Sequence, residues 1–446
     1  MGDERRLSFR YLLTPDGLVR DRAVVVDAAG TILGLETAAG PWEGTFALPG
    51  MPNAHSHIFQ RALAGYCEAR RGEDSFWSWR EAMYRLAASL DAESLYVIAR
   101  YAYGEMLAAG FTSVAEFHYL HHRKDGTRGT EMAEAVAAAA RDAGIRLRLL
   151  PVLYQRGGFD RPAEPAQRRF VHERLEDYLA LLEALAPLHP GLAFHSLRAV
   201  APSVLSPALA AARRILGADI PVHIHIAEQR REIAECRAAT GQTPIELLSA
   251  TIPLDAHWTL VHATHAEPSE LAAIAASGAT VALCPLTEAY LGDGIFPARA
   301  FLDAGGVFAI GSDANARLDA VEELRLLEYG QRLAEEARAR FADAEGLGAA
   351  LWGRAAAGGG ATLGLPIGAI APGCKADFVV LEPGADALLG HAPETWPDAL
   401  IVAGGRGTLA AVYVGGERRV ERGEWPGQAE SARRYDETVR TLLEQT

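Results

Sequence analysis

Two pairs of histidines have a spacing that suits a metal ion. His55 and His57 stand two residues apart in PNAHSHI, and His223 and His225 do so in VHIHI. Alternate side chains of a β-strand point to the same side, so both imidazoles of a pair could bind one ion. A single pair is weak evidence, because a chain with 14 histidines contains roughly 0.4 such pairs by chance.

Further acid and imidazole groups follow other apolar runs. Glu228 comes three residues after His225, His262 ends the run WTLVHAT, and Asp313 ends VFAIGSDA. Each alone would suit a structural role as well as a functional one. Together they combine imidazole nitrogen with carboxylate oxygen, the ligand set of a borderline metal such as zinc. Of the second pair, His225 lies nearer the end of its run, where barrel sites occur, so it is favoured as the ligand. His223 is then expected to be a buried core residue.

Eight short apolar runs carry or separate these residues, and longer stretches of helical period lie between them. Eight is the number of strands in a closed (β/α)8 TIM barrel, whose active sites lie at the carboxyl ends of the strands. The sequence therefore predicts an α/β protein of this type, with an open doubly wound sheet as the alternative. The runs cover residues 50–58, 111–119, 145–154, 192–200, 220–228, 258–264, 280–286 and 307–314. The clearest helical stretches are 92–107, 130–143, 169–185, 267–276 and 318–337.

The two ends of the chain have a different pattern of apolar and polar residues from the middle. Residues 1–48 and 366–446 contain alternating apolar and polar runs with glycine turns, which are typical of β-hairpins. We expect these flanks to pair into one small β-sandwich-like domain, with a helix over residues 428–445. The barrel is expected to occupy residues 49–365.

Composition limits the classes of function. Hydrophobic residues make up 49% of the chain and charged residues 22%, as in soluble globular proteins. The net charge of -14 disfavours nucleic acid and anionic membranes as partners. We find neither a signal-peptide pattern nor an apolar stretch of about 20 residues, so a cytoplasmic location is expected. The four scattered cysteines suggest no disulfide framework and no cysteine zinc site.

Four phrases of the sequence resemble formimidoylglutamate deiminases of the amidohydrolase superfamily. They are PGMPNAHSHIFQRALAG, TSVAEFHYLHH, HIHIAEQ and IGSDAN. The resemblance implies a single Zn2+ per subunit, or Fe2+ or another divalent ion in its place, and a homodimer. It assigns the metal ligands as His55, His57, His225 and Asp313. Some superfamily members bridge two metals with a carboxylated lysine, whereas the two lysines here, Lys124 and Lys375, lie on no mid-barrel run.

The reaction implied by the resemblance is the hydrolysis of N-formimidoyl-L-glutamate, a dicarboxylate, to N-formyl-L-glutamate and ammonia. Asp313 would take a proton from a metal-activated water, Glu228 would carry a proton to the departing nitrogen, and His262 would stabilise the tetrahedral intermediate. The substrate carboxylates need arginine. The substrate-binding candidates are Gln60, Arg80, Tyr119, His195 and Arg198.

Other interpretations stay open at this point. Arg80 could be a solvated helix residue and Tyr119 a core aromatic. We interpret the crowded His118, His121 and His122 as a solvated surface loop rather than a second metal site. Two rival functions are an aminohydrolase of the same superfamily acting on a guanine-like or s-triazine-like ring, and a non-catalytic binding protein that retains the barrel.

Overall fold

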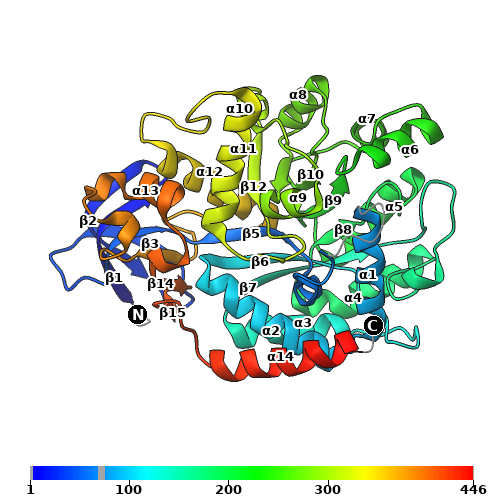
Figure 1. Ribbon diagram of the computed structural model, residues 1–446, viewed down its shortest axis with the longest axis horizontal. Helices are drawn as coiled ribbons and strands as arrows, with labels where there is room; N and C mark the ends of the chain where they lie inside the picture. Colours follow the sequence, from blue (N-terminus) through cyan, green and yellow to red (C-terminus); the bar gives the residue numbers. More distant parts are fainter. Residues whose placement is uncertain (1–3, 69–75, 445–446) are drawn as a thin grey trace.

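The computed structural model describes residues 4–68 and 76–444 of the chain. Its centre is a parallel sheet of eight strands in the spatial order β12-β11-β10-β9-β8-β7-β6-β5, so consecutive strands of the sequence are neighbours in space. Figure 1 shows helices around this sheet. The strands are β5 (Met51–Ser56), β6 (Phe111–His118), β7 (Arg146–Leu153), β8 (Leu192–Phe194), β9 (Val222–Ile226), β10 (Trp258–His262), β11 (Thr280–Leu283) and β12 (Val307–Ile310).

The first and last of these strands meet at their carboxyl ends. The backbone N–H of His57 donates to the carbonyl of Asp313 at 2.9 Å. The N–H groups of Ser312 and Asp313 both donate to the carbonyl of His55, each at 3.0 Å. These bonds close the sheet into a barrel, so the predicted (β/α)8 fold is confirmed and the open sheet is excluded.

Helices follow most of the strands and cover the outside of the barrel, and their ends carry ordinary capping signals. The carboxylate of Asp91 accepts the N–H of Ser94 at 2.9 Å at the start of α2, and Gly144 ends α3 in the left-handed region with a φ of 83°. These helices are α1 (Phe76–Ser89), α2 (Ala92–Ala108), α3 (Glu131–Ala143), α4 (Leu175–Leu185), α5 (Pro202–Leu216), α6 (Arg230–Thr240), α7 (Pro244–Thr251), α8 (Pro268–Ser277), α9 (Pro285–Leu291), α10 (Ala298–Asp303), α11 (Ala320–Glu335) and α12 (Leu347–Leu363).

One helix begins later than the sequence predicts. The expected helix over 169–185 starts only at Leu175. Before it, Arg169 is buried, and its guanidinium donates to the carbonyls of His122 at 2.8 Å and Leu90 at 2.6 Å. These long-range bonds hold the residues around Arg169 in a loop. Tertiary contacts therefore prevent a helix there, although the sequence has helical periodicity.

The two flanks of the chain form a second sheet beside the barrel, as predicted. Its seven strands have the order β15-β14-β13-β4-β1-β2-β3, and β4 joins β13 with Phe378 opposite Pro49. All pairs are antiparallel except β1 with β4. The seven strands belong to one hydrogen-bonded sheet rather than to two separate stacked ones. The strands are β1 (Arg5–Thr14), β2 (Gly17–Val26), β3 (Ile32–Thr37), β4 (Gly44–Pro49), β13 (Phe378–Leu381), β14 (Leu409–Val414) and β15 (Glu417–Glu421).

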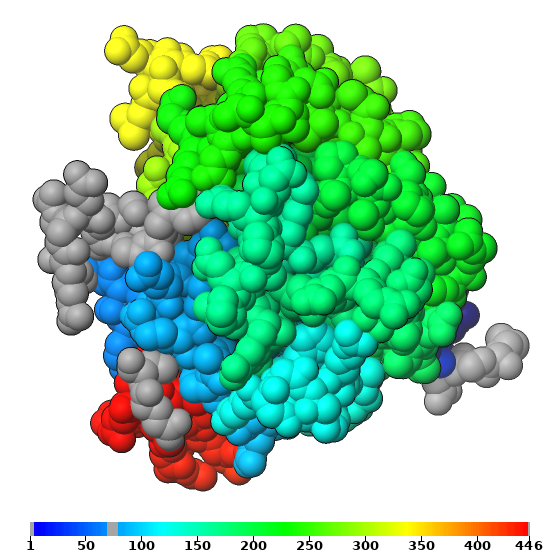
Figure 2. Space-filling view, turned by 90° about the vertical axis from the view of Figure 1, so that its right-hand side faces the viewer, coloured from blue at the N-terminus to red at the C-terminus, as the bar shows by residue number. Residues whose placement is uncertain are grey.

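Two more helices belong to the carboxyl-terminal flank, α13 (Trp396–Ala403) and α14 (Gln428–Glu444). Helix α14 leaves the second sheet and runs along the barrel helices, where the hydroxyl of Tyr435 donates to the carbonyl of Arg61 at 3.1 Å. Figure 2 shows the red helix α14 beside the blue part of the chain, while cyan and green segments cover most of this face and a yellow segment lies at its upper edge. In the described residues, no helix is both long enough and apolar enough to cross a bilayer.

Candidate active site and metal centre

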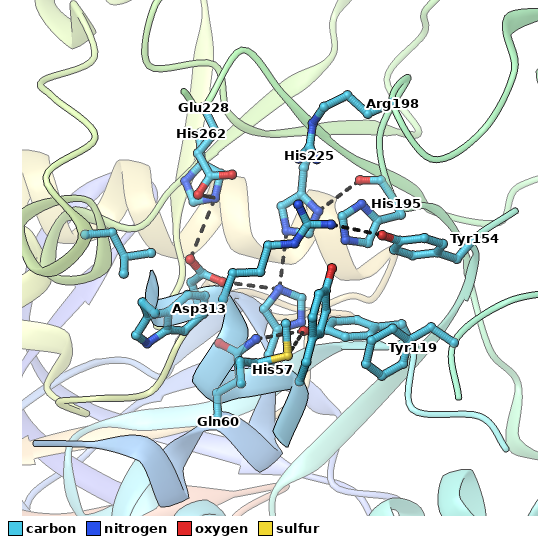
Figure 3. Close-up of a pocket in the computed structure, with 16 residues that line it drawn as sticks. His57, Gln60, Tyr119, Tyr154, His195, Arg198, His225, Glu228, His262 and Asp313 are labelled. Carbon is cyan, nitrogen blue, oxygen red and sulfur yellow. Dashed lines mark hydrogen bonds and ion pairs between the residues drawn. The ribbon is translucent and has the colours of Figure 1, made fainter. Parts of the chain in front are cut away.

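Three imidazoles and one carboxylate converge at the carboxyl end of the barrel. The Nε2 atoms of His55, His57 and His225 lie 3.0 to 3.3 Å from one another. Oδ1 of Asp313 lies 3.4 Å from the Nε2 of His55 and 3.3 Å from that of His57. These residues come from β5, the residue just after it, β9 and the residues after β12. Figure 3 shows His57, His225 and Asp313 directed at one another.

Backbone carbonyls decide which nitrogen faces the centre in two of the three rings. Nδ1 of His57 donates to the carbonyl of Phe117 at 3.0 Å, and Nδ1 of His225 donates to that of His195 at 2.9 Å. With the proton on Nδ1, the two Nε2 atoms face each other with lone pairs only, which cannot form a hydrogen bond. A cation removes this repulsion. The observed spacing equals that of donor atoms around an ion at roughly 2 Å, so the residues fit a metal such as zinc.

The pKa directions of the imidazoles agree with this fit. Burial, together with the neighbouring imidazoles, holds the pKa values of His55 and His225 well below the usual range. Both rings are therefore neutral at pH 7. Neutral imidazole is the form that binds a metal.

His223 lies on the opposite face of β9 from His225. Its ring is buried, and Nε2 donates to the carbonyl of Thr362 at 2.8 Å, against helix α12. The alternation of a strand thus brings His225 into the cluster and leaves His223 in the packing between strand and helix.

Glu228 and His262 lie beside the four candidate metal ligands, His55, His57, His225 and Asp313, which form the metal-ligand cluster of the proposal below. Nε2 of His262 is 3.8 Å from Oε1 of Glu228 and 3.7 Å from Oδ2 of Asp313. Burial and the charge of Asp313 raise the pKa of Glu228 to about 7, although His262 acts against the shift. Burial lowers the pKa of His262, but the carboxylates of Glu228 and Glu288 outweigh it and raise that pKa to about 10. The site therefore combines a cationic imidazole with a carboxyl group that can gain or lose a proton near neutral pH.

Unusual backbone geometry is concentrated at the ends of the strands that carry these groups. Non-glycine residues adopt positive φ angles after β9 (Ala227, 52°), at the end of β10 (His262, 69°, and Ala263, 49°) and after β12 (Asp313, 42°, and Asn315, 55°). Such conformations cost free energy and persist where the surrounding structure enforces them. Here they accompany side chains that turn into the barrel mouth.

A cavity that is partly open to solvent lies above the cluster. In Figure 3, Glu228, His262 and Asp313 lie on one side of it, and His195, Tyr154 and Tyr119 lie on the other. The structure brings every predicted substrate-binding residue to this cavity. They are Gln60, Arg80, Tyr119, His195 and Arg198.

The two arginines reach the cavity from different elements. Arg80 belongs to α1, donates to the hydroxyl of Tyr154 at 3.3 Å, and lies 5.1 Å from the centre of the Tyr84 ring. Arg198 belongs to the loop after β8, and its carbonyl accepts from Arg156 at 3.1 Å. Nε of Arg198 is buried and has no hydrogen-bond partner among the described residues. Arg80 is thus no solvated helix residue, and both arginines line the same cavity.

Gln60 and Tyr119 form a polar pair in the wall of the cavity. Nε2 of Gln60 donates to the hydroxyl of Tyr119 at 2.8 Å, and within the described part of the chain Oε1 of Gln60 has no partner. His195 packs edge-on against Tyr154 with ring centres 4.5 Å apart. These groups offer both hydrogen-bond donors and acceptors to a polar ligand.

Several residues of the cavity were not predicted from the sequence. Most are aromatic or apolar, and only Tyr154 carried a usable signal, since it ends the run IRLRLLPVLY at the barrel mouth. Glu288 does not line the cavity but contacts His262, and it carried no signal because it lies on α9. The other unpredicted lining residues are Trp79, Met83, Tyr84, Phe170 and Leu291.

The interpretation of the histidine-rich loop is wrong. His118, His121 and His122 are buried rather than solvated. Nε2 of His121 donates to the carbonyl of Val152 and Nε2 of His122 to that of Val171, each at 2.8 Å. The loop is covered because the buried guanidinium of Arg169 binds the carbonyl of His122.

Neither lysine takes part in the site. Nζ of Lys124 pairs with Asp91 at 3.0 Å, and Nζ of Lys375 donates to the carbonyl of Ala29 at 3.1 Å. A bridging carboxylated lysine is therefore absent from the cluster, as expected from the sequence.

Comparisons with known proteins agree with this site. The model of the amidohydrolase family matches residues 46–419. The chain is 46% identical to a formimidoylglutamate deiminase of Pseudomonas aeruginosa, covering 97% of this chain and 98% of that one. It is 30% identical to a 5-methylthioadenosine/S-adenosylhomocysteine deaminase of Natronomonas pharaonis, over 83% and 82% of the two chains. The crystal structure of an amidohydrolase from Brucella melitensis superimposes with a TM-score of 0.91 at 40% identity, covering 98% of this chain and all of that one.

Proposed function

Because the chain belongs to the amidohydrolase family, we propose that it hydrolyses N-formimidoyl-L-glutamate to N-formyl-L-glutamate and ammonia. One observation carries the choice of substrate. Two guanidinium groups, those of Arg80 and Arg198, face the same cavity as the cluster of histidines and Asp313. An acidic protein that binds a dicarboxylate needs such local positive charge.

In this proposal His55, His57, His225 and Asp313 hold one divalent ion, and the nitrogen-rich ligand set favours Zn2+ over Mg2+ or Ca2+. When bound, the ion acts as a Lewis acid that lowers the pKa of a water molecule. All other steps belong to the side chains.

Water adds its oxygen to the formimidoyl carbon, and Asp313 accepts the proton that this oxygen loses. The carboxyl group of Glu228 gives a proton to the terminal nitrogen, and its pKa of about 7 suits a group that both gains and loses protons at neutral pH. The proton held by Asp313 then passes to the same nitrogen, and the bond from carbon to that nitrogen breaks. The remaining O–H proton returns to Glu228 as the C=O bond forms, and ammonia leaves. The nitrogen of glutamate stays bound to the formyl carbon.

The cationic ring of His262 stabilises the charge that develops on the oxygen in the tetrahedral state. Its Nε2 lies within 4 Å of both Glu228 and Asp313, so the three groups surround one small volume. A fixed charge stabilises a transition state more strongly in a site of low dielectric constant than in water.

Arg80 and Arg198 pair with the two carboxylates of the substrate and orient the formimidoyl group toward Glu228. Gln60, Tyr119 and His195 supply further polar contacts to the glutamate part. Orientation by such contacts lowers the entropic part of the barrier.

A ring aminohydrolase is the second candidate, and the 30% identical deaminase shows that this family includes enzymes named for adenosine compounds. A neutral ring has no carboxylates that could pair with two arginines in the cavity. The third candidate, a binding protein without catalysis, does not explain a complete set of ligands beside Glu228 and His262. A homodimer and a cytoplasmic location stay predictions.

The test is ammonia release by purified, metal-analysed protein from N-formimidoyl-L-glutamate, N-formimidoyl-L-aspartate, guanine and cytosine. We expect rapid turnover of the first compound and slow or no turnover of the rest. Turnover of a ring in preference to N-formimidoyl-L-glutamate would reject the substrate. A protein that binds no metal would reject the mechanism.

A further inference from the structure

Helix α9 crosses the barrel mouth directly after β11, and its first turn is buried against the site. Two adjacent residues of this turn, Thr287 and Glu288, contact the loop that carries Asp313 and the ring of His262, respectively. The hydroxyl of Thr287 donates to the carbonyl of Ser312 at 3.1 Å and accepts the N–H of Ala314 at 3.2 Å, so it grips the loop on both sides of Asp313. The next residue is Glu288, which faces His262.

A single oxygen of Glu288 holds the imidazole and is itself held by the backbone. Oε1 accepts from Nδ1 of His262 at 3.2 Å and from the N–H of Cys284 at 3.0 Å. The side chain of Glu288 is only 7% exposed. A buried carboxylate fixed at two points leaves the imidazole little rotational freedom.

The ring of His262 has two ways to occupy its plane, and only one suits the proposed function. The ring lies almost parallel to that of His225, with an interplanar angle of 14° and centres 5.7 Å apart, which fixes the plane. A half-turn about the Cβ–Cγ bond keeps this plane and exchanges the positions of the two edges of the ring. Bonding of Nδ1–H to Glu288 selects the orientation that directs Nε2 at Glu228 and Asp313.

The backbone at this point does not enforce that orientation alone. His262 itself has a φ of 69° and Ala263 one of 49°, so two consecutive residues occupy the sparsely populated left-handed region. These φ angles place the backbone of His262 but leave the rotation of its ring about the Cβ–Cγ bond to side-chain contacts.

We propose that Glu288 is the positioning residue of His262, which holds Nδ1–H by a hydrogen bond and directs Nε2 into the reaction centre. The inference rests on the proposed function, in which His262 stabilises the tetrahedral state. Glu288 acts through His262 and does not line the substrate cavity. The competing explanation is that Glu288 only caps helix α9, since the same oxygen accepts the N–H of Cys284 near the start of the helix.

The experiment compares Glu288→Gln and Glu288→Ala with a matched control, Glu323→Gln. Glu323 is also fully buried and accepts the N–H of Leu286 in the same turn of α9 at 2.8 Å, but it has no hydrogen bond to His262 among the described contacts. Burial raises the pKa of Glu323 well above its usual value, so the neutral acid and glutamine are close in charge and shape.

We expect kcat to fall in the order wild type, Glu288→Gln, Glu288→Ala, with a loss of about 10- to 100-fold for alanine. KM and metal content should stay within about threefold, because Glu288 contacts neither substrate nor metal. Glu323→Gln should keep kcat within about twofold. Glutamine retains an accepting oxygen, so it should rescue part of the loss. A capping role alone predicts a lower melting temperature for Glu288→Ala with unchanged kcat, and that result would overturn the inference.

A spectroscopic readout separates this inference from the proposed function. In zinc-loaded protein labelled with 15N-histidine, the ring signals of His262, assigned by their loss in His262→Gln, should show a proton on Nδ1 in the wild type. They should shift or broaden in Glu288→Ala and not in Glu323→Gln. If the wild type does not turn over N-formimidoyl-L-glutamate, the proposed function fails while the ring signals still test Glu288. Signals unchanged in Glu288→Ala would overturn the positioning role.

Discussion

Two buried groups of histidines lie in the same barrel and use their ring nitrogens in opposite ways. In the metal-ligand cluster, carbonyls bind Nδ1 of His57 and His225, so the Nε2 atoms are left to converge within 3.3 Å. In the second group, made of His118, His121, His122 and His172, carbonyls bind Nε2 of His121 and His122. Their rings meet His172 edge to face, with centres 4.9 and 4.7 Å apart.

The difference shows that burial and clustering of histidines do not by themselves make a metal site. Both groups are buried to a similar degree. What separates them is which nitrogen the backbone occupies, and whether the remaining nitrogens and a carboxylate share one point in space. Among the described residues, the second group contains no such convergence of ligand atoms.

The strongest test of this contrast is His225→Ala, with His223→Gln as control on the opposite face of the same strand. His225→Ala should lose bound metal, and kcat/KM should fall by on the order of 10³-fold or more, beyond the roughly 10- to 100-fold typical of outer-sphere changes. His223→Gln should keep the metal because glutamine can still donate to Thr362. Elemental analysis and ammonia release measure both. A metal-loaded His225→Ala protein would show that the cluster was misidentified.

Glu228→Gln should separate metal binding from catalysis. Glutamine keeps the shape of the side chain but cannot carry a proton, so kcat should fall by about 10² to 10⁴ while metal content stays at the wild-type level. Steady-state kinetics on protein of measured metal content gives the answer. Full turnover in this variant would remove Glu228 from its role.

Arg198→Ala should affect binding more than chemistry. A charge-assisted hydrogen bond contributes about 1.5–3 kcal/mol, which corresponds to a loss of about 10- to 150-fold in kcat/KM, mainly through KM. The control is an N-formimidoyl compound with one carboxylate. If Arg198 binds a substrate carboxylate, wild type and variant should differ less on that compound than on N-formimidoyl-L-glutamate. Equal losses on both compounds would contradict the assignment.

The second group of histidines should make the fold sensitive to acid. Burial lowers the pKa values of His118 and His172 to about 3, whereas an unfolded histidine titrates near 6.5. The unfolded state therefore binds more protons below pH 6.5, and the stabilisation present above that pH is lost as the pH falls from about 6.5 toward 3. The slope should reach about 1.4 kcal/mol per pH unit for each histidine.

The variant His172→Phe tests this slope, since it keeps an aromatic ring and removes one titrating group. Between pH 7 and 5 the melting temperature of the wild type should fall more steeply with pH than that of the variant. Parallel curves would show that His172 does not titrate on unfolding.

Much of the fold could be predicted because each barrel strand is a short apolar run with its own boundaries. Residues His55, His225, His262 and Asp313 were recognisable because the carboxyl ends of parallel strands meet at one mouth. The burial of His121 could not be predicted, since it depends on Arg169, which binds the carbonyl of the next residue from a distant loop. The contact of Glu288 with His262 likewise depends on how α9 packs across the barrel end, and no local pattern of the sequence encodes it.

The hydrogen bonds between the ends of β5 and β12 have a consequence for how the protein is made. They join His55 and His57 to Asp313, so the first and last ligands along the chain lie on opposite sides of the closing seam. On a ribosome, a nascent chain that lacks β12 already has its three histidine ligands but lacks their carboxylate partner and the closed ring. Under the proposed metal binding, we expect uptake at full affinity to follow ring closure, and the bound ion would hold the two ends of the barrel together.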